Sequence, residues 1–278
     1  MASITDCVTE GLKYPFGDIK KLLGFGALFA IMSAISVFIG AKSFEIFRIC
    51  AHVADKNNIT VSHIPFSQLP AGDIYLVAGL TIISFIVLLF ILGYQYDIVK
   101  LSIEKKEDLP EFGDILGIFV RGIKYFLVIV AYSLIPMLVL FGGTALVGDS
   151  SVLSVIILIW LVLFIIEYFL LIMALNNMVA HDSLKKAFDL EEIIGNISNL
   201  GWGKYVGTVL FTVIAYMIIM VAVNFVLSFL TVIFAATVNN QAMVISIVIA
   251  VIEGLFIHSY GSLFFNRVCG SIYRESIK

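Results

Sequence analysis

Charged side chains are scarce in this chain of 278 residues: 13% of them are Asp, Glu, Lys or Arg, whereas 61% are hydrophobic. The mean hydropathy is +1.07. Soluble domains carry about 25% charged residues, so a water-exposed surface of this size cannot be assembled from this composition. The sequence therefore excludes a soluble globular protein and predicts one that is integral to a membrane.

The chain also lacks the spacings that indicate metal, disulfide or cytosolic catalytic sites. Its cysteines, Cys7, Cys50 and Cys269, form neither a CxxC pair nor a spacing with histidine, so we predict no disulfide framework and no metal site. GxSxG, HExxH, Walker A and Rossmann signatures do not occur in a suitable context. We expect no cofactor and favour a non-enzyme, although a lipid-modifying enzyme that works with a few intramembrane polar residues stays open.

Apolar residues are gathered in six long runs, each close to or above the roughly 20 residues with which a helix crosses a bilayer. Lipid offers no partners to backbone amides, and no barrel-type alternation is present, so each run is predicted to be helical. The first run is longer than the core of a cleaved signal peptide and is read as a retained span. We predict an all-α polytopic membrane protein, a single transmembrane domain over 1–278, with spans at about 22–39, 74–93, 125–147, 152–173, 205–234 and 243–265.

Lysine and arginine fall mainly on one side of these spans. With alternating loops, fourteen lie on the side of both termini and three on the other. Positive residues accumulate on the cytoplasmic side, so we expect a multi-pass protein of the cell (plasma) membrane with both termini in the cytoplasm. Acidic residues are equally numerous there, so no polybasic patch for nucleic acid is predicted. The basic residues on the two sides are Lys13, Lys20, Lys21, Lys100, Lys105, Lys106, Arg121, Lys124, Lys185, Lys186, Lys204, Arg267, Arg274 and Lys278, against Lys42, Arg48 and Lys56.

A short unit recurs before the odd-numbered spans. Phe16-Gly17-Asp18-Ile19 returns as Phe112-Gly113-Asp114-Ile115, and a looser copy begins at Ala187-Phe188-Asp189. Each copy mixes apolar and charged residues. We predict short amphipathic helices along the cytoplasmic interface before spans 1, 3 and 5, near 18–23, 111–119 and 184–197.

Short motifs at the span ends carry a family resemblance. They are Tyr14-Pro15-Phe16, Gly93-Tyr94, Leu109-Pro110-Glu111-Phe112, and Ala187-Phe188 together with Gly201-Trp202 and Lys204-Tyr205. With these motifs the chain resembles an uncharacterised prokaryotic, largely archaeal, membrane family filed as domain of unknown function 4013. The resemblance implies a polytopic membrane protein and supplies no catalytic residues.

Two carboxylates stand out because Glu167 and Glu253 lie inside long apolar runs, without a Lys or Arg within thirteen residues. Ionisable residues at membrane depth are rare and are paired, neutral or turned toward a cavity. Ser246, Glu253 and Tyr260 are seven residues apart and share one face of a regular helix, and Asn224 lies in the intervening fifth span. We predict one intramembrane polar cluster of Glu167, Glu253, Asn224, Ser246 and Tyr260.

Two readings of this cluster stay open. In the first, the protein is of the transport type and moves an ion, a proton-coupled solute or a lipid past Glu167 and Glu253. In the second it is a non-catalytic scaffold or partner subunit whose polar groups join helices by hydrogen bonds. Membrane lipids are the expected partners, and a homo-oligomer or a membrane partner protein stays open. The sequence names no substrate.

Overall fold

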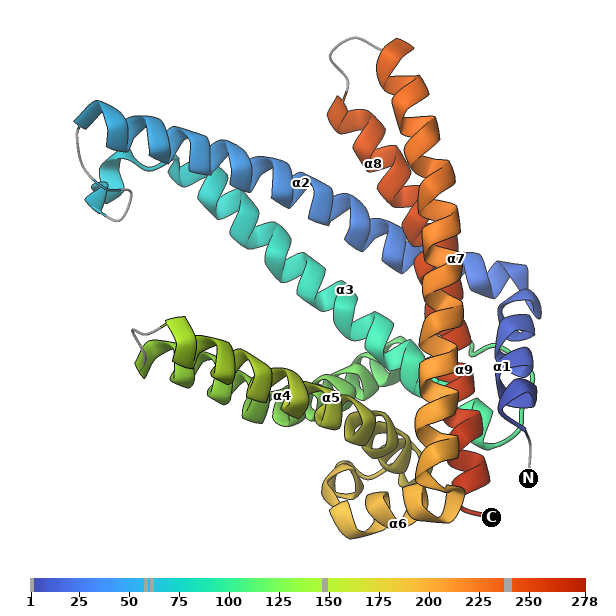
Figure 1. Cartoon of the computed structure of the whole chain (residues 1–278). Helices are drawn as coiled ribbons and strands as arrows, with labels where there is room; N and C mark the ends of the chain where they lie inside the picture. The colour runs from blue at the N-terminus through green and yellow to red at the C-terminus, as the bar shows by residue number, and fades with distance from the viewer. Residues whose placement is uncertain (1–2, 58–59, 61–62, 147–149, 238–241) are drawn as a thin grey trace. The chain divides into compact units, whose positions relative to one another are not determined.

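The structure is a computed structural model that describes residues 3–57, 60, 63–146, 150–237 and 242–278. All regular structure in these residues is helical (Figure 1). In chain order the elements are α1 (Ile4–Lys13), η1 (Tyr14–Phe16), α2 (Ile19–Asn57), η3 (Phe66–Gln68), α3 (Ala71–Ile103), α4 (Ile115–Leu146), α5 (Ser150–His181), η4 (Leu184–Phe188), α6 (Leu190–Leu200), α7 (Trp202–Thr237), α8 (Ala242–Ile252), the π-helical segment η5 (Glu253–His258) and α9 (Ser259–Ser276).

Six helical stretches of the described residues are long and apolar enough to cross a membrane, as predicted: Ile19–Lys56, Ala71–Ile103, Ile115–Ala145, Val152–His181, Trp202–Phe229 and Met243–Ser276. The prediction of an all-α polytopic membrane protein is thereby confirmed. Several helices extend well past the apolar runs. Hydropathy predicts which part of a helix suits lipid, but it does not predict where the backbone hydrogen bonds of the helix end.

Two of the predicted short helices are not separate elements. Residues 19–23 are the opening turns of α2, and residues 115–119 those of α4. The third copy does contain a distinct helix, α6, and a further short helix, α1, lies upstream of the first copy. Whether any of these segments lies along a membrane interface stays a prediction.

The chain divides into two compact units that cut across the long helices. Unit 1 comprises Met1–Leu22, Leu92–Ile218 and Tyr260–Lys278, and unit 2 comprises Leu23–Ile91 and Ile219–Ser259. Each unit is described below by itself.

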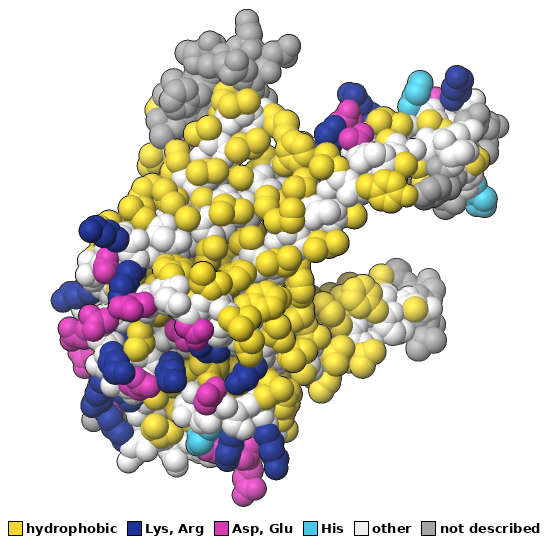
Figure 2. Space-filling view, turned by 180° about the vertical axis from the view of Figure 1, so that it is seen from behind, with side chains coloured by type: hydrophobic (Ala, Val, Ile, Leu, Met, Phe, Trp, Pro, Cys, Tyr) yellow, Lys and Arg dark blue, Asp and Glu magenta, His cyan; other side chains and the backbone are white. Residues whose placement is uncertain are grey.

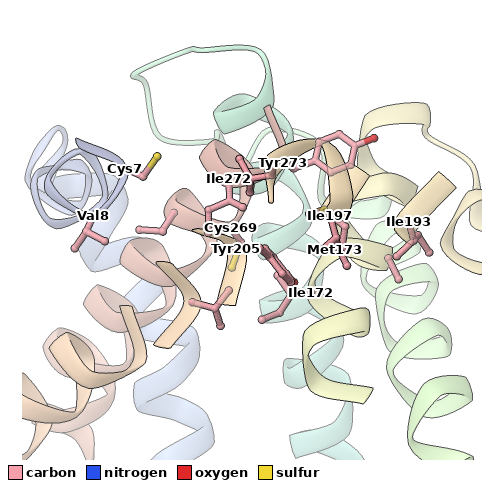
Figure 3. Packing of buried hydrophobic residues seen from close by; sticks show 14 of the residues in the cluster. Cys7, Val8, Ile172, Met173, Ile193, Ile197, Tyr205, Cys269, Ile272 and Tyr273 are labelled. Carbon is pink, nitrogen blue, oxygen red and sulfur yellow. The ribbon is translucent and has the colours of Figure 1, made fainter. Parts of the chain in front are cut away.

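Unit 1 has a buried core built from five helices. Figure 3 shows Cys7 and Val8 of α1 near Tyr205 of α7 and Cys269 of α9, together with isoleucines from α5, α6 and α9. The short helix α1 packs into this core. Ser3 caps its first turn. Gly11 has no side chain, so α1 lies directly against the Val268 side chain of α9, where a Cβ atom would overlap it. The hydropathy pattern did not predict α1, although Ser3 and Asp6 form a capping box that marks a helix start.

Charged side chains gather at one end of unit 1, beyond the hydrophobic surface of its helices (Figure 2). There Glu10 of α1 pairs with Arg267 at 2.6 Å and with Arg274 at 3.3 Å, both on α9. The Arg267 guanidinium also lies 4.6 Å from the Tyr14 ring centroid. Burial raises the pKa of Tyr14 to about 12. Because Arg267 is almost fully buried, its pairing with Glu10 avoids an uncompensated charge and holds the first helix to the last.

The motif residues Gly93 and Tyr94, in the second half of α3, contact α4 and the loop between α3 and α4. Gly93 packs so closely on the backbone carbonyl of Ile118 in α4 that a Cβ atom would overlap it. Next to it the Tyr94 hydroxyl donates to the Pro110 carbonyl at 2.9 Å, and its ring stacks on Phe112 at 4.6 Å between centroids. These motif residues therefore hold α3, the loop and α4 together, which is a structural role.

Unit 2 contains a second close helix approach. Gly26 of α2 lies against the carbonyl of Leu255, and Gly254 lies against the backbone of Ala30, so α2 and the π-helical segment touch backbone to backbone. Toward the other end of α2, Lys42 pairs with Asp73 at the start of α3 at 3.2 Å.

Candidate functional site

A cavity in unit 1 lies beside the α4–α5 hairpin and has a volume of about 430 Å³. Figure 1 shows α4 and α5 side by side, with α6 at one end of the pair. Ligand pockets range over roughly 300–1,000 Å³, so this cavity has room for a small ligand or part of a lipid. Its walls come from α4, α5 and the η4–α6 connection: Ala131, Tyr132, Ile135, Pro136, Leu163, Ile166, Glu167, Leu170, Phe188 and Leu190. We call it the Glu167 pocket.

Segment η4 closes this pocket because two hydrogen bonds hold it against the hairpin. The Tyr132 hydroxyl of α4 donates to the Ala187 carbonyl at 2.7 Å, and the Asn177 amide of α5 donates to the Lys186 carbonyl at 2.9 Å. Asn177 in turn accepts from the Tyr273 hydroxyl at 2.6 Å. The chain thereby returns along α5 after His181, and Phe188 stacks on Tyr132 with 5.9 Å between ring centroids.

The start of α6 is fixed by charge. Asp189 caps the helix by accepting from the Glu192 backbone amide, and Lys186 pairs with Asp189 at 3.0 Å and with Glu192 at 2.6 Å. The hydrogen bond from Lys186 lowers the pKa of Asp189, and the hydrogen bonds to Glu192 and Asp189 raise the pKa of Lys186. This cap holds Phe188 and Leu190, which flank Asp189, in the lining of the pocket.

Glu167 is the acidic group of the pocket, and its side chain is only partly satisfied. The residue is 9% exposed. The Ser133 hydroxyl of α4 donates to Oε1 at 3.1 Å. The other oxygen, Oε2, is buried and has no hydrogen-bond partner in the part of the chain that the structure describes. A buried polar atom without a partner costs about 1–3 kcal/mol, so a hydrogen-bond donor brought to Oε2 would stabilise it.

Pro136 interrupts the backbone hydrogen bonding of α4 beside the pocket. Proline has no backbone N–H, so the carbonyl of Tyr132, four residues earlier in α4, lacks its usual helical donor. Both residues line the pocket. The part of α4 that lines the cavity is therefore a helix whose hydrogen-bond ladder is interrupted.

The remaining lining is apolar, and its rim is exposed. Ile135 is 64% exposed, Ile166 is 51% exposed, and Phe188 and Leu190 are exposed to a similar degree. In the most apolar stretch of α5 just 6% of the residues are buried inside the structure. Both α4 and α5 are long and apolar enough to span a membrane, so the exposed part of the lining belongs to helices whose outer surface suits lipid.

The structure divides the predicted polar cluster between the two units. Glu167 and Tyr260 belong to unit 1, whereas Asn224, Ser246 and Glu253 belong to unit 2. Tyr260 donates to the Leu12 carbonyl at 3.1 Å, and the Asn224 amide donates within its own helix to the Met220 carbonyl at 2.9 Å. The association of Glu167 with Glu253 stays a prediction.

The predicted common face of Ser246, Glu253 and Tyr260 assumed a regular α-helix. The structure instead has a π-helical segment that begins at Glu253 and ends at His258. A π-helix bonds residue i to i+5 and so places more residues in each turn. The seven-residue spacing therefore does not by itself establish a common face across this segment, and the shared face stays a prediction. Glu253, half-buried, begins a type of segment that is frequent at functional sites.

Sequence reasoning missed Tyr132 and Phe188, which line the pocket, and Ser133, which bonds to Glu167. Ser133 had a usable signal, since it is a hydroxyl inside an apolar run three residues before Pro136. Phe188 had none, because its position depends on how the chain turns back after α5. In the described residues no group of three His, Cys, Asp or Glu side chains lies close enough together to hold a metal ion.

Comparisons with known proteins are consistent with the motifs at the span ends. A family model described as "Protein of unknown function (DUF4013)" matches residues 76–252, more than half of the chain. The match includes α4, α5, η4 and α6, and so every residue that lines the Glu167 pocket. No curated protein and no solved structure matches the chain. The chain therefore belongs to the DUF4013 family, whose function is unknown.

Proposed function

We propose that this protein binds a lipid-like molecule in the Glu167 pocket, as a membrane protein of the transport type whose cargo is an amphiphile. The observation that supports the proposal is an apolar cavity of about 430 Å³ that lies beside two membrane-length helices and holds one incompletely bonded carboxyl. Apolar walls favour a hydrocarbon chain through burial. The carboxyl favours a ligand that also carries a polar group.

A scaffold function is the second candidate, and a different observation favours it. In the most apolar stretches of α4 and α5, 11% and 6% of the residues are buried, so most of the hairpin surface is left for lipid or for another protein. A scaffold would use this outer surface and would have no need of an open pocket. A lipid-modifying enzyme has less support, because the described lining holds one carboxyl and no histidine, cysteine or lysine beside it.

The proposed setting is the cell (plasma) membrane, with both termini in the cytoplasm. All fourteen basic residues assigned to the cytoplasmic side belong to unit 1, and the three assigned to the outside belong to unit 2. The positive-inside rule then makes the charged end of unit 1 the cytoplasmic one. The pocket lies beside η4 and α6, which connect spans four and five on that side, so the cargo would enter from the inner half of the bilayer.

Retained lipid measures the proposed binding. The full-length protein is purified in a neutral detergent. The lipids that it retains are then extracted and quantified by mass spectrometry. We expect a stoichiometric lipid in the native protein and its loss in Ala131→Phe, whose new ring fills the pocket. Leu134→Phe is the control, since it places the same ring on α4 at an exposed position outside the lining. Equal retention by all three proteins, each folded by thermal melting, would overturn the proposal.

A further inference from the structure

The polar groups of the Glu167 pocket define the chemistry of the ligand more narrowly, provided that the proposed lipid binding holds. Glu167 supplies Oε2, which is buried and has no partner in the described residues. The Tyr132 hydroxyl is already committed to the Ala187 carbonyl. Among the side chains Oε2 is left, and the lining residue Tyr132 also has a carbonyl that Pro136 deprives of its helical donor.

We propose that the pocket selects a long-chain amphiphile whose polar end is a single uncharged hydroxyl. A hydroxyl is both a donor and an acceptor. The ligand hydroxyl can therefore form a hydrogen bond with Oε2 whether that oxygen carries a proton or a negative charge. Its remaining lone pair or proton is then free to bond to a second group of the lining. The apolar chain lies among Ile135, Leu163 and Ile166, which form the lining beyond the carboxyl.

A phosphate head group does not suit this site. Among the described residues that line the pocket, none is Lys, Arg or His, so an anion would have no countercharge and would face the Glu167 carboxyl. Lys186, the nearest lysine along the chain to Phe188, is engaged by Asp189 and Glu192.

An ammonium head group suits it less well than a hydroxyl. An ammonium would need an ionised Glu167, and the described residues give that carboxylate a single supporting donor, Ser133. A buried ion pair is stabilising when further hydrogen bonds satisfy both partners. An ammonium has three donors, and the apolar lining would leave most of them without acceptors.

Competition binding tests the selection. Radiolabelled hexadecan-1-ol is bound to the full-length protein in neutral detergent and displaced by unlabelled hexadecan-1-ol, hexadecane, hexadecylammonium or hexadecyl phosphate. The four competitors share one chain and differ at its end. We expect the alcohol to compete at least about tenfold better than the other three, the size expected of one buried hydrogen bond.

Substitutions of Glu167 separate a hydrogen bond from a charge. Glu167→Leu should weaken alcohol binding about tenfold and bring it to the level of hexadecane. Glu167→Gln keeps a donor and an acceptor and should stay close to the native affinity. Glu111→Leu, a change of the same kind at an exposed position in the α3–α4 loop, should have no effect.

The outcomes also separate this inference from the proposed function. Preference for hexadecylammonium, with loss in Glu167→Gln, would overturn the hydroxyl selection and leave lipid binding intact. Equal competition by hexadecane and the alcohol would do the same. Absence of binding by all four, or binding that Ala131→Phe leaves unchanged, would overturn both.

Discussion

The Ser133 hydroxyl on α4 and the Glu167 carboxyl on α5 are joined by a hydrogen bond of 3.1 Å. This bond crosses the hairpin and fixes one oxygen of the carboxyl, which leaves the other as the incompletely bonded atom of the pocket. The helix pair thus presents a polar group in an apolar wall and at the same time holds that group in one orientation.

Ser133→Ala should destabilise the protein by about 1–3 kcal/mol, because it leaves both Glu167 oxygens without a partner. Thermal unfolding in detergent measures the change. In a Glu167→Leu background the same substitution should cost much less, since there is no acceptor left to lose. Ser36→Ala is the control: the Ser36 hydroxyl bonds within its own helix to the Met32 carbonyl, and its loss should change stability little. Equal effects of Ser133→Ala in both backgrounds would contradict the described bond.

Gly93→Ala should lower the unfolding temperature, because the added Cβ would overlap the Ile118 carbonyl and push α3 from α4. Gly79→Ala is a matched control in the same helix, where nothing lies near the added atom. There the change should be neutral or stabilising, by about 0.5–1 kcal/mol, since alanine favours a helix over glycine. If the two variants unfold alike, the close approach of α3 and α4 is wrong.

Asp182 should make the folded protein less stable as the pH falls. It accepts from the Tyr96 hydroxyl at 2.7 Å and from Lys124 at 3.2 Å, and these bonds lower its pKa below the ordinary 3.8. The lowered pKa of Asp182 stabilises the fold at any pH above the pKa that this group has in the unfolded state. This contribution is lost as the pH falls through the pKa that it has in the folded state. Unfolding temperatures measured between pH 7 and pH 3 should fall less steeply for Asp182→Asn. The side chain is largely exposed, so the difference should be small.

Cysteine labelling tests the orientation, but the native cysteines are poor reporters. Cys7, Cys50 and Cys269 are all buried, and burial raises the pKa of the Cys7 thiol, so failure to label them says little about sidedness. We expect Lys185→Cys, exposed in η4, to react with an impermeant maleimide after membranes are opened. Ser67→Cys, exposed between α2 and α3, should react in intact cells. The reverse pattern would invert the topology.

Hydropathy was sufficient to predict the six spans and the membrane class, because helix formation in lipid follows from backbone hydrogen bonding alone. Helix ends were less predictable. Residues such as Lys42 and Arg48 end the apolar run of span one, yet α2 continues through them to Asn57. The π-helical segment was missed because the spacing argument assumed 3.6 residues per turn throughout.

The candidate site was predictable in its key residue and not in its surroundings. Glu167 stood out as a carboxyl inside an apolar run, and it does line a cavity. Ser133 and Phe188 reach it from other elements, through the hairpin and through the return of η4 along α5. Such contacts depend on tertiary packing, to which the local pattern of one sequence gives no access.

Photo-crosslinking to a long-chain alcohol that carries a diazirine in its chain tests the Glu167 pocket most directly. The full-length protein is labelled in vesicles and the modified peptides are mapped by mass spectrometry. We predict adducts on 131–136 and 163–170, competition by hexadecan-1-ol, and loss of these adducts in Ala131→Phe but not in Leu134→Phe. Adducts spread along the outer surfaces of α4 and α5, unchanged by competitor and by Ala131→Phe, would contradict the pocket as a binding site.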